Sequence, residues 1–136
     1  MNVKPIKLLL IEDNIGDSVI IRKMLEESEN TTFELTHAPR LKNGLKHLET
    51  EKFDIILLDL GLPDSEGFES FKITLRKHPV IPIIILTGLE DEEIGIKTIK
   101  YGAQDYLVKG EFNGKLLVRA IQYAIERKKL EGLFIY

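Results

Sequence analysis

The chain has 136 residues, of which 43% are hydrophobic and 30% charged, as in an ordinary globular domain that buries a core without cross-links. The formal net charge of −3 argues against direct contact with nucleic acid, and the absence of cysteine excludes disulfides and thiolate metal sites. The first apolar stretch is too short for a signal peptide, and no apolar run could span a bilayer, so we expect a cytoplasmic protein without a membrane partner.

Short apolar runs alternate along the chain with longer segments of helical periodicity. The runs predict five strands, at residues 6–11, 33–36, 55–58, 83–86 and 106–108. The other segments predict five helices, at residues 17–28, 41–51, 68–77, 91–101 and 114–130. Four strands are rich in Ile, Leu and Val, which is typical of strands covered on both faces. This order favours a single α/β domain, a doubly wound (βα)5 fold with a parallel five-stranded sheet and helices on both faces.

The predicted helices carry apolar stripes that should pack on the sheet. In the first helix the stripe consists of Val19, Ile20, Met24 and Leu25. In the second it consists of Leu41, Leu45 and Leu48, and Gly44 is the one residue that fits this helix poorly. The last helix has one apolar face formed by Leu117, Ile121 and Ala124, and another formed by Leu116, Ala120, Tyr123 and Leu130. One face suffices to pack on the sheet, which leaves the other free.

Polar residues follow four of the predicted strands. Asp59 ends one apolar run and precedes a Gly- and Pro-rich loop, so we expect it at the exposed rim of the sheet, where open α/β folds collect functional groups. The pair Glu12-Asp13 follows the first strand, Thr87 the fourth and Lys109 the fifth. Three carboxylates, one hydroxyl and one ammonium at strand ends indicate phosphoryl chemistry with a divalent metal.

These motifs, read in order, resemble the signature of the response-regulator receiver domain over about residues 5–130. They are Glu12-Asp13, Asp59 to Pro63 with Gly67, Thr87-Gly88, and Tyr106 to Lys109. The resemblance implies a flavodoxin-like sheet in the order 2-1-3-4-5. It also implies that Asp59 accepts a phosphoryl group from a histidine kinase or phosphotransfer protein. The domain would then be no enzyme, beyond Mg-dependent self-phosphorylation and slow self-dephosphorylation.

The resemblance also implies roles for the residues around Asp59. A Mg²⁺ (or Mn²⁺) would be held by Asp13, by Asp59 and by the backbone carbonyl of Gly61, with Glu12 acting mainly through bound water. The metal would neutralise the repulsion between a carboxylate and a charged phosphoryl donor. Without metal, carboxylates this close should raise at least one carboxylate pKa.

Two further groups would contact the phosphoryl oxygens. These are the Lys109 ammonium and the Thr87 hydroxyl. Gly88 would keep the approach to Thr87 open, and we expect the close backbone there to require a residue without a side chain.

The resemblance implies a route by which the signal leaves the site. Thr87 would move toward the phosphoryl group, and Tyr106 would swing into the space it vacates. That would reshape the face of the fourth helix, fifth strand and fifth helix, a possible homodimer interface. The fourth helix is poor in helix-forming residues, since it contains Gly95, Ile94, Ile96, Thr98 and Ile99. Its order should therefore depend on packing, and we predict that it is the output switch.

The sequence departs from the family pattern in three places. Gly110 follows Lys109 where many receivers have proline, so no cis peptide bond is expected there. Glu12 replaces one of the two more usual aspartates. Gly61 and Leu89, two residues beyond Asp59 and Thr87, offer no polar side chain to position an attacking water, which predicts slow self-dephosphorylation.

Other interpretations stay open. Asn14 and Asp17 could simply cap the first helix, and an aromatic residue such as Tyr106 often only packs. The three histidines (His37, His47 and His78) share no motif and are interpreted as structural or solvated. A receiver fold can also act as an interaction or dimerisation module that needs no phosphorylation. A phosphatase of the Asp-x-Asp kind is disfavoured, because Leu60-Gly61 places no second carboxylate at the required position.

The predicted domain covers residues 1–130, and residues 131–136 form a C-terminal tail or a truncated linker. Gly132 should end the last helix, and the four residues after it are unusually apolar for a free tail. This stretch resembles that of receivers at the front of larger signalling proteins, which suggests a C-terminal output module reached through a signalling helix. No DNA-binding helix-turn-helix follows residue 130 in this sequence.

Overall fold

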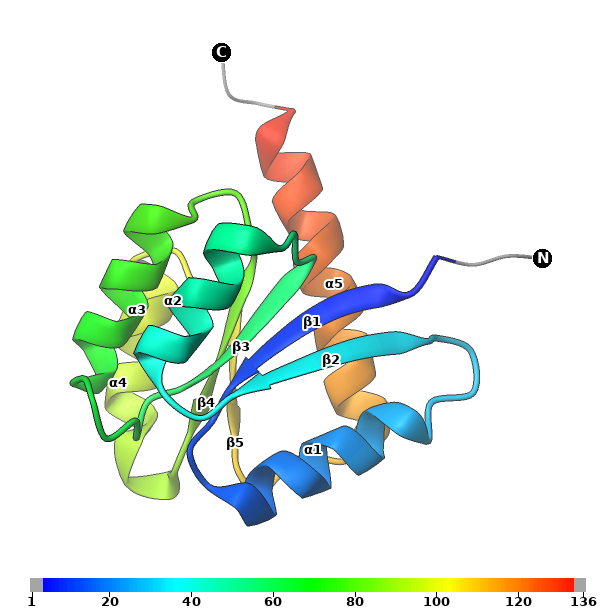
Figure 1. Ribbon diagram of the computed structural model, residues 1–136, viewed down its shortest axis with the longest axis horizontal. Coiled ribbons are helices and arrows are strands. Elements are labelled where there is room, and N and C mark those ends of the chain that lie inside the picture. Colours follow the sequence, from blue (N-terminus) through cyan, green and yellow to red (C-terminus); the bar gives the residue numbers. More distant parts are fainter. Residues whose placement is uncertain (1–3, 134–136) are drawn as a thin grey trace.

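The computed structural model describes residues 4–133 and places the polar strand ends along one edge of a central sheet (Figure 1). The five parallel strands are β1 (Ile6–Ile11), β2 (Phe33–Ala38), β3 (Ile55–Asp59), β4 (Ile83–Thr87) and β5 (Asp105–Val108). Their order is β2-β1-β3-β4-β5, which confirms the predicted flavodoxin-like topology.

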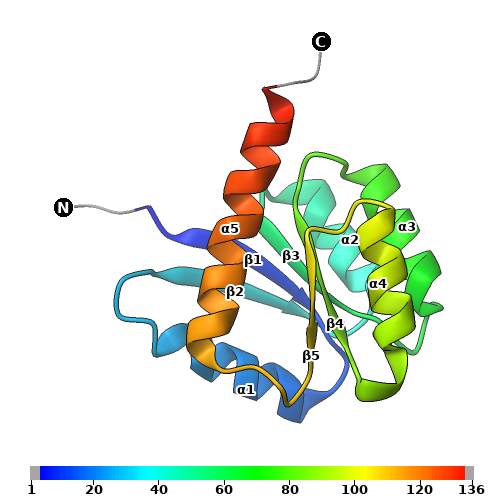
Figure 2. The same cartoon turned by 180° about the vertical axis from the view of Figure 1, so that it is seen from behind.

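Helices cover both faces of the sheet, so the fold has three layers (Figures 1 and 2). One face carries α1 (Ile15–Glu26) and α5 (Gly114–Gly132). The other carries α2 (Leu41–Thr50), α3 (Gly67–Lys77) and α4 (Glu92–Lys100). A short 3-10 turn, Leu89–Asp91, leads into α4. Within the described part of the chain, no helix combines the length and the apolar character needed to cross a membrane.

The absence of polar alternation in the strands follows from this layering. Successive strand side chains point to opposite faces, and here each face is a core. The α1–α5 side buries Leu8, Leu10, Ile55, Leu57, Ile84 and Leu86. The α2–α4 side buries Leu9, Ile11, Ile56, Leu58, Ile83 and Ile85. Every residue of β3 and β4 is buried, the functional Asp59 and Thr87 included.

Element boundaries differ from the predicted ones by one or two residues. β3 and β4 each include one more residue than predicted, so Asp59 and Thr87 are the last residues of their strands. β2 continues to Ala38, and β5 begins at Asp105. The predicted helix 91–101 is shorter in the structure. The 3-10 turn includes its first residue, Asp91, and the α-helix runs from Glu92 to Lys100.

The predicted apolar stripe of α1 is wrong in part. Val19 and Ile20 are 57% and 54% exposed, and the buried residues of this helix are Ser18, Ile21 and Leu25. The helix begins at Ile15, two residues earlier than predicted, because the Asn14 side chain caps it by accepting the Asp17 N–H at 2.9 Å. Ser18 can face the core because its hydroxyl donates to the Ile15 carbonyl at 2.8 Å, which satisfies its polar group.

The glycine inside α2 is explained by a close approach to the sheet. A Cβ at Gly44 would lie 2.5 Å from Ile11 Cδ1 and 2.8 Å from Ile11 Cγ1, so a side chain there would require the buried Ile11 side chain or the helix to shift. Leu41 and Leu48 are buried as predicted, and Leu45 is partly buried beside them.

α2 takes its N-terminal cap from a distant loop. Arg40 at the N-cap position makes no side-chain cap. Instead the Asp64 carboxylate accepts the backbone N–H groups of Leu41 at 3.0 Å and Lys42 at 3.2 Å. Burial acts to raise the pKa of Asp64, but these two N–H donors outweigh it and hold the pKa below its ordinary value. The loop that follows Asp59 is thereby tied to the start of α2.

α5 packs on the sheet through Leu117, Ile121 and Ala124, as predicted. Ala120 is buried as well, contrary to its predicted place on the free face, whereas Tyr123 is exposed. The helix ends at Gly132 as predicted, and its last turns extend beyond the sheet (Figures 1 and 2). The apolar residues 134–136 lie outside the described residues.

The outer half of α5 is fastened to the loop before β5. Arg127 donates to the Gln104 side chain through Nε and to its backbone carbonyl through Nη2, each at 3.1 Å. The Gln104 amide donates in turn to Glu131 at 3.1 Å. Arg127, which lies in the sequence between Tyr123 and Leu130 of the predicted free face, therefore joins α5 to the residue before β5, a contact we call the clamp.

Candidate functional site

The site lies at the carboxyl ends of β1, β3, β4 and β5, which the sheet register brings to one edge. Asp59 pairs with Leu86, one residue before Thr87, so Asp59 and Thr87 end neighbouring strands. The Lys109 N–H donates to the Thr87 carbonyl at 2.8 Å, and this hydrogen bond places the backbone of Lys109 beside that of Thr87.

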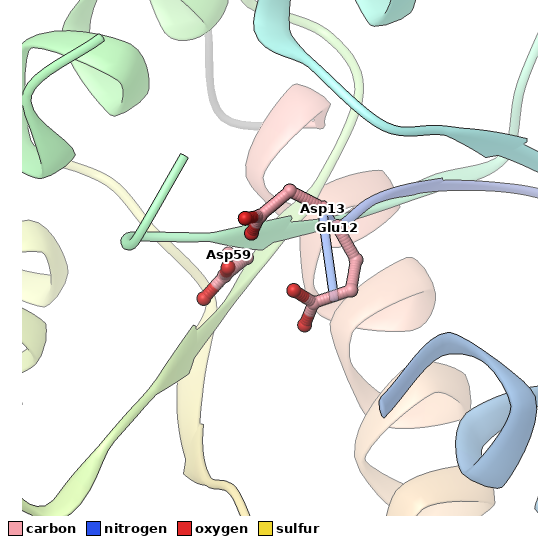
Figure 3. A group of neighbouring side chains, drawn as sticks. All are labelled: Glu12, Asp13 and Asp59. Atoms are coloured by element: carbon pink, nitrogen blue, oxygen red, sulfur yellow. The ribbon is translucent and has the colours of Figure 1, made fainter. Parts of the chain in front are cut away.

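Three carboxylates converge at this edge, and we call Glu12, Asp13 and Asp59 the acid cluster (Figure 3). Each offers one oxygen that lies within 4.8 Å of the corresponding oxygens of the other two. Asp13 is exposed, but Glu12 is 0% and Asp59 only 4% exposed, so the prediction that Asp59 stands at an exposed rim is wrong. The Asp59 side chain lies among those of Glu12, Asp13 and Lys109, a depth that strand periodicity does not reveal.

The acid cluster has the donor set of a hard divalent cation. Carboxylate oxygens are the ligands that Mg²⁺ and Mn²⁺ prefer, and carboxylates that crowd together need a counter-charge. The exposed Asp13 opens the cluster to solvent on one side, which leaves room for the waters that Mg²⁺ retains. These residues could therefore hold a metal ion.

Gly61 lies beside the Asp59 carboxylate. A Cβ at this position would be 3.5 Å from Asp59 Oδ2, an ordinary contact distance. The predicted backbone ligand is thus adjacent to the acid cluster.

The Lys109 ammonium is the cation of the site. Its Nζ lies 2.6 Å from Glu12 Oε1 and 3.1 Å from Asp59 Oδ1. The third partner is Asp17 on α1, whose Oδ2 lies 3.0 Å away. Burial acts to lower the pKa of Lys109, but its hydrogen bonds to Glu12 and Asp17, together with the nearby negative charges, raise this pKa above its ordinary range. Lys109 is therefore charged at every physiological pH.

Glu12 is the carboxylate with the strongest perturbation. Its Oε2 accepts the Asn14 N–H at 3.1 Å, and its backbone carbonyl lies 2.6 Å from His37 Nε2. Burial is the main cause that raises the pKa of Glu12 to about 7, followed by the hydrogen bond to Asp59 and its charge. The predicted raised carboxylate pKa is confirmed, although desolvation contributes more than repulsion between carboxylates.

Glu12 should make the stability of the metal-free protein depend on pH. Since folding raises its pKa from 4.5 to about 7, the folded state binds this proton more tightly than the unfolded chain. The resulting stabilisation is fully present below a pH of about 4.5 and is lost as the pH rises to about 7. Relative to the variant Glu12→Gln, we expect the free energy of unfolding to fall by about 3 kcal/mol over this window. Denaturant unfolding with a chelator present measures this; parallel profiles for the two proteins would contradict the assignment.

The Thr87 hydroxyl is fully buried and has no hydrogen-bond partner in the structure. Among the buried side-chain polar atoms of residues 4–133, only Thr87 Oγ1 and Glu12 Oε1 lack one. For Glu12 the ion-pair contact with Lys109 compensates, but Thr87 has no such compensation. A buried hydroxyl without a partner is costly, so Thr87 Oγ1 is a group whose burial packing alone does not explain.

The expectation that a close backbone at Gly88 requires a residue without a side chain is wrong. A Cβ there would meet only Asp91 Oδ2, at 3.8 Å, and this is an ordinary contact. The backbone beside Thr87 therefore tolerates a small side chain.

Gly95 of α4 makes the close approach instead. A Cβ at this position would lie 3.0 Å from Thr87 Cγ2 and 3.1 Å from two ring atoms of Tyr106. Gly95 is buried, and the hydroxyl of Thr98 donates to its carbonyl at 2.6 Å. The backbone of α4 thus packs directly on both predicted switch residues.

Residues 8–122 match the family model of the response regulator receiver domain, a range that contains every predicted site residue. The chain belongs to the response regulator receiver family. Receiver domains support phosphorelay signalling in two-component systems and are not in themselves a family of catalytic enzymes.

Similar proteins agree with this assignment. The receiver domain is 36% identical over 115 residues to the KDP operon transcriptional regulatory protein KdpE of Escherichia coli, covering 82% of this chain and 49% of that protein. It is 34% identical over 124 residues to the cell cycle response regulator CtrA of Brucella ovis, covering 90% of this chain and 51% of that protein. The chain thus spans about half the length of these relatives. A receiver domain crystal structure from Clostridium thermocellum matches with a TM-score of 0.80 and 31% identity, covering 92% of this chain and 98% of that one.

One charged neighbour of the site, Asp17, was not predicted. It was interpreted only as part of a helix cap, and its ion pair with Lys109 spans 92 positions in the sequence. The interpretation of His37 as structural agrees with its contact, which is with the backbone of Glu12 rather than with a reacting group. The spacing of four residues between Asp13 and Asp17 was the one available signal, and it indicates only that Asp17 lies near the start of the helix after β1.

Proposed function

We propose that this receiver domain is a switch of a two-component phosphorelay, in which Asp59 accepts a phosphoryl group from a histidine kinase or phosphotransfer protein. The observation that carries the proposal is the surrounding of Asp59: a buried carboxylate with an ammonium at 3.1 Å, beside a buried hydroxyl that lacks a partner. Simple packing or capping would explain neither the ammonium nor the hydroxyl. Both groups are hydrogen-bond donors of the kind that stabilise phosphoryl oxygens.

The transfer forms a bond between an Asp59 carboxylate oxygen and phosphorus, while the bond from phosphorus to the donor nitrogen or oxygen breaks and the donor keeps that electron pair. Lys109 would stabilise one phosphoryl oxygen, and Thr87, with the neighbouring Gly88, would contact another. Glu12, Asp13, Asp59 and the Gly61 carbonyl would hold Mg²⁺ or Mn²⁺. The ion supplies positive charge that offsets the repulsion between the carboxylate and the incoming phosphate.

The signal would pass from Thr87 and Tyr106 to the face formed by α4, β5 and α5. The packing of Gly95 against both residues supports this route, since a movement of either side chain changes the surface on which α4 rests. The same face would serve a homodimer.

The phosphorylated state should decay slowly. Gly61 has no side chain, and Leu89 is apolar and 68% exposed, so neither can orient a water molecule toward the phosphorus. We propose residues 1–130 as the receiver domain and residues 131–136 as a tail or truncated linker to an output module, in a cytoplasmic protein whose receiver contacts neither nucleic acid nor membrane directly.

The proposal is tested by incubating the protein with a small phosphodonor, with Mg²⁺ or with a chelator, and by measuring the mass of the protein and of the peptide that contains Asp59. We expect one phosphoryl adduct on that peptide, formed only with Mg²⁺. An absent adduct would favour a module that acts without phosphorylation, and continuous release of phosphate from unrelated substrates would favour a phosphatase.

A further inference from the structure

Asp17 is a charged neighbour of the site that belongs neither to the acid cluster nor to the family motifs quoted above. It occupies the third position of α1, and its Oδ2 lies 3.0 Å from Lys109 Nζ. Both side chains are partly buried, with 34% of Asp17 and 23% of Lys109 exposed. The contact is a charge-assisted hydrogen bond that joins α1 to the loop after β5.

Helix capping does not explain this carboxylate. In a capping box, the side chain at the third helical position accepts the N–H of the N-cap residue. Here the N-cap residue is Asn14, and its N–H donates to Glu12 Oε2 at 3.1 Å instead. The cap needs only the backbone of Asp17, whose N–H donates to Asn14 Oδ1. The Asp17 carboxylate is therefore left for Lys109.

The turn after β5 fixes the backbone of Lys109, since the Glu111 N–H donates to the Val108 carbonyl at 3.0 Å, but it does not fix the lysine side chain. Gly110 has a φ of +85°, and a side chain built at this position would have no neighbour within 4 Å. The Lys109 N–H is held by the Thr87 carbonyl, but the long side chain beyond it depends on its ionic partners.

The three partners of the ammonium are not equivalent. Glu12 and Asp59 belong to the acid cluster, so a cation bound there would compete with Lys109 for their oxygens, and a phosphoryl group on Asp59 would occupy one of them. Asp17 is outside the cluster, so its oxygen stays available to Lys109 when those groups are bound. We propose that Asp17 is a positioning residue, which holds the Lys109 ammonium over Asp59 while Glu12 and Asp59 are engaged. This inference rests on the proposed function.

A double-mutant cycle tests the inference. The variants are Asp17→Asn, Lys109→Gln and the double variant, and the rate of Asp59 phosphorylation is measured with a small phosphodonor at saturating Mg²⁺. We expect Asp17→Asn to slow the reaction about tenfold, the effect of losing one charge-assisted hydrogen bond. In the Lys109→Gln background the same substitution should change the rate less than about twofold. Asp17→Glu, which keeps the carboxylate, should recover most of the rate.

A second measurement does not depend on phosphorylation. In the metal-free protein, hydrogen exchange of the Lys109 ammonium, followed by nitrogen NMR, should be faster in Asp17→Asn than in the native protein. Asp54→Asn is the matched control, because Asp54 is exposed and accepts the Lys7 N–H at the opposite end of the sheet. It should alter neither the exchange nor the phosphorylation rate.

The outcomes separate this inference from the proposed function. A native rate in Asp17→Asn, or equal slowing in both Lys109 backgrounds, would overturn the positioning role and leave phosphorylation of Asp59 intact. Unchanged ammonium exchange would overturn it as well. A native protein that is never phosphorylated would overturn the proposed function, and the positioning role with it.

Discussion

The variant Asp59→Asn is expected to form no phosphoryl adduct and, without metal, to be more stable than the native protein at pH 8. An amide is not a nucleophile toward phosphorus under these conditions, so the loss of the adduct should be complete. The gain in stability follows from the site. Asp59 raises the pKa of Glu12, so its removal makes ionised Glu12 less costly to bury. Lys109 keeps Glu12 and Asp17 as partners.

We expect the free energy of unfolding to rise by about 1 kcal/mol, the scale on which active-site carboxylates lower stability. Denaturant unfolding with a chelator present measures it, and intact mass after incubation with a phosphodonor measures the adduct. Asp54→Asn serves as the control, since it removes one carboxylate far from the site and should change neither result. An adduct that persists in Asp59→Asn would place the acceptor elsewhere, and a loss of stability would show that Asp59 is a structural partner of Lys109.

The substitution Gly95→Ala is expected to destabilise the protein, although alanine is the better helix former by about 1 kcal/mol. The added methyl group would lie 3.0 Å from Thr87 Cγ2 and 3.1 Å from the Tyr106 ring. Because both neighbours are packed against the sheet, relief requires α4 to move outward or Tyr106 to change its position. Overpacking of this kind costs about 1–3 kcal/mol, and Gly95→Val should cost more than Gly95→Ala.

The matched control for this prediction is Gly132→Ala in the last turn of α5. A side chain at Gly132 would have no neighbour within 4 Å, so the helix propensity of alanine should leave this variant as stable as the native protein or slightly more stable. Thermal unfolding of both variants measures the difference. If Gly95→Ala proved as stable as Gly132→Ala, α4 would be loosely packed on the switch residues, and the proposed route through Gly95 would lose its support.

The architecture could be predicted because strands buried on both faces leave an unmistakable apolar pattern. The run that ends at Leu58 has no polar alternation, and its neighbours along the chain repeat that pattern between amphipathic segments. The parallel order then brings all strand ends to one edge, so residues as far apart as Asp13 and Lys109 were predicted to share a site. α1 was harder to predict, because a serine such as Ser18 can satisfy its hydroxyl on its own helix and take a core position.

The depth and pairing of the site could not be predicted from the chain. Strand periodicity indicates the face of the sheet to which the Asp59 side chain points. It does not indicate how deeply the rest of the site buries that side chain, so its burial was missed. The pairing of Asp17 with Lys109 depends on how α1 packs beside the last loop, and no local pattern encodes that distance. The role of Gly95 depends on the approach of one helix backbone to two side chains on different strands.

The clamp at Gln104 has a mechanical consequence. Three hydrogen bonds join this residue to Arg127 and Glu131, while Tyr106 lies two positions further along the chain. A tilt of the strand that bears Tyr106 must therefore either break these bonds or rotate the protruding turns of α5 with it. If the bonds hold, the protruding turns of α5 would change direction when the strand tilts, because they are joined to the chain two residues before Tyr106.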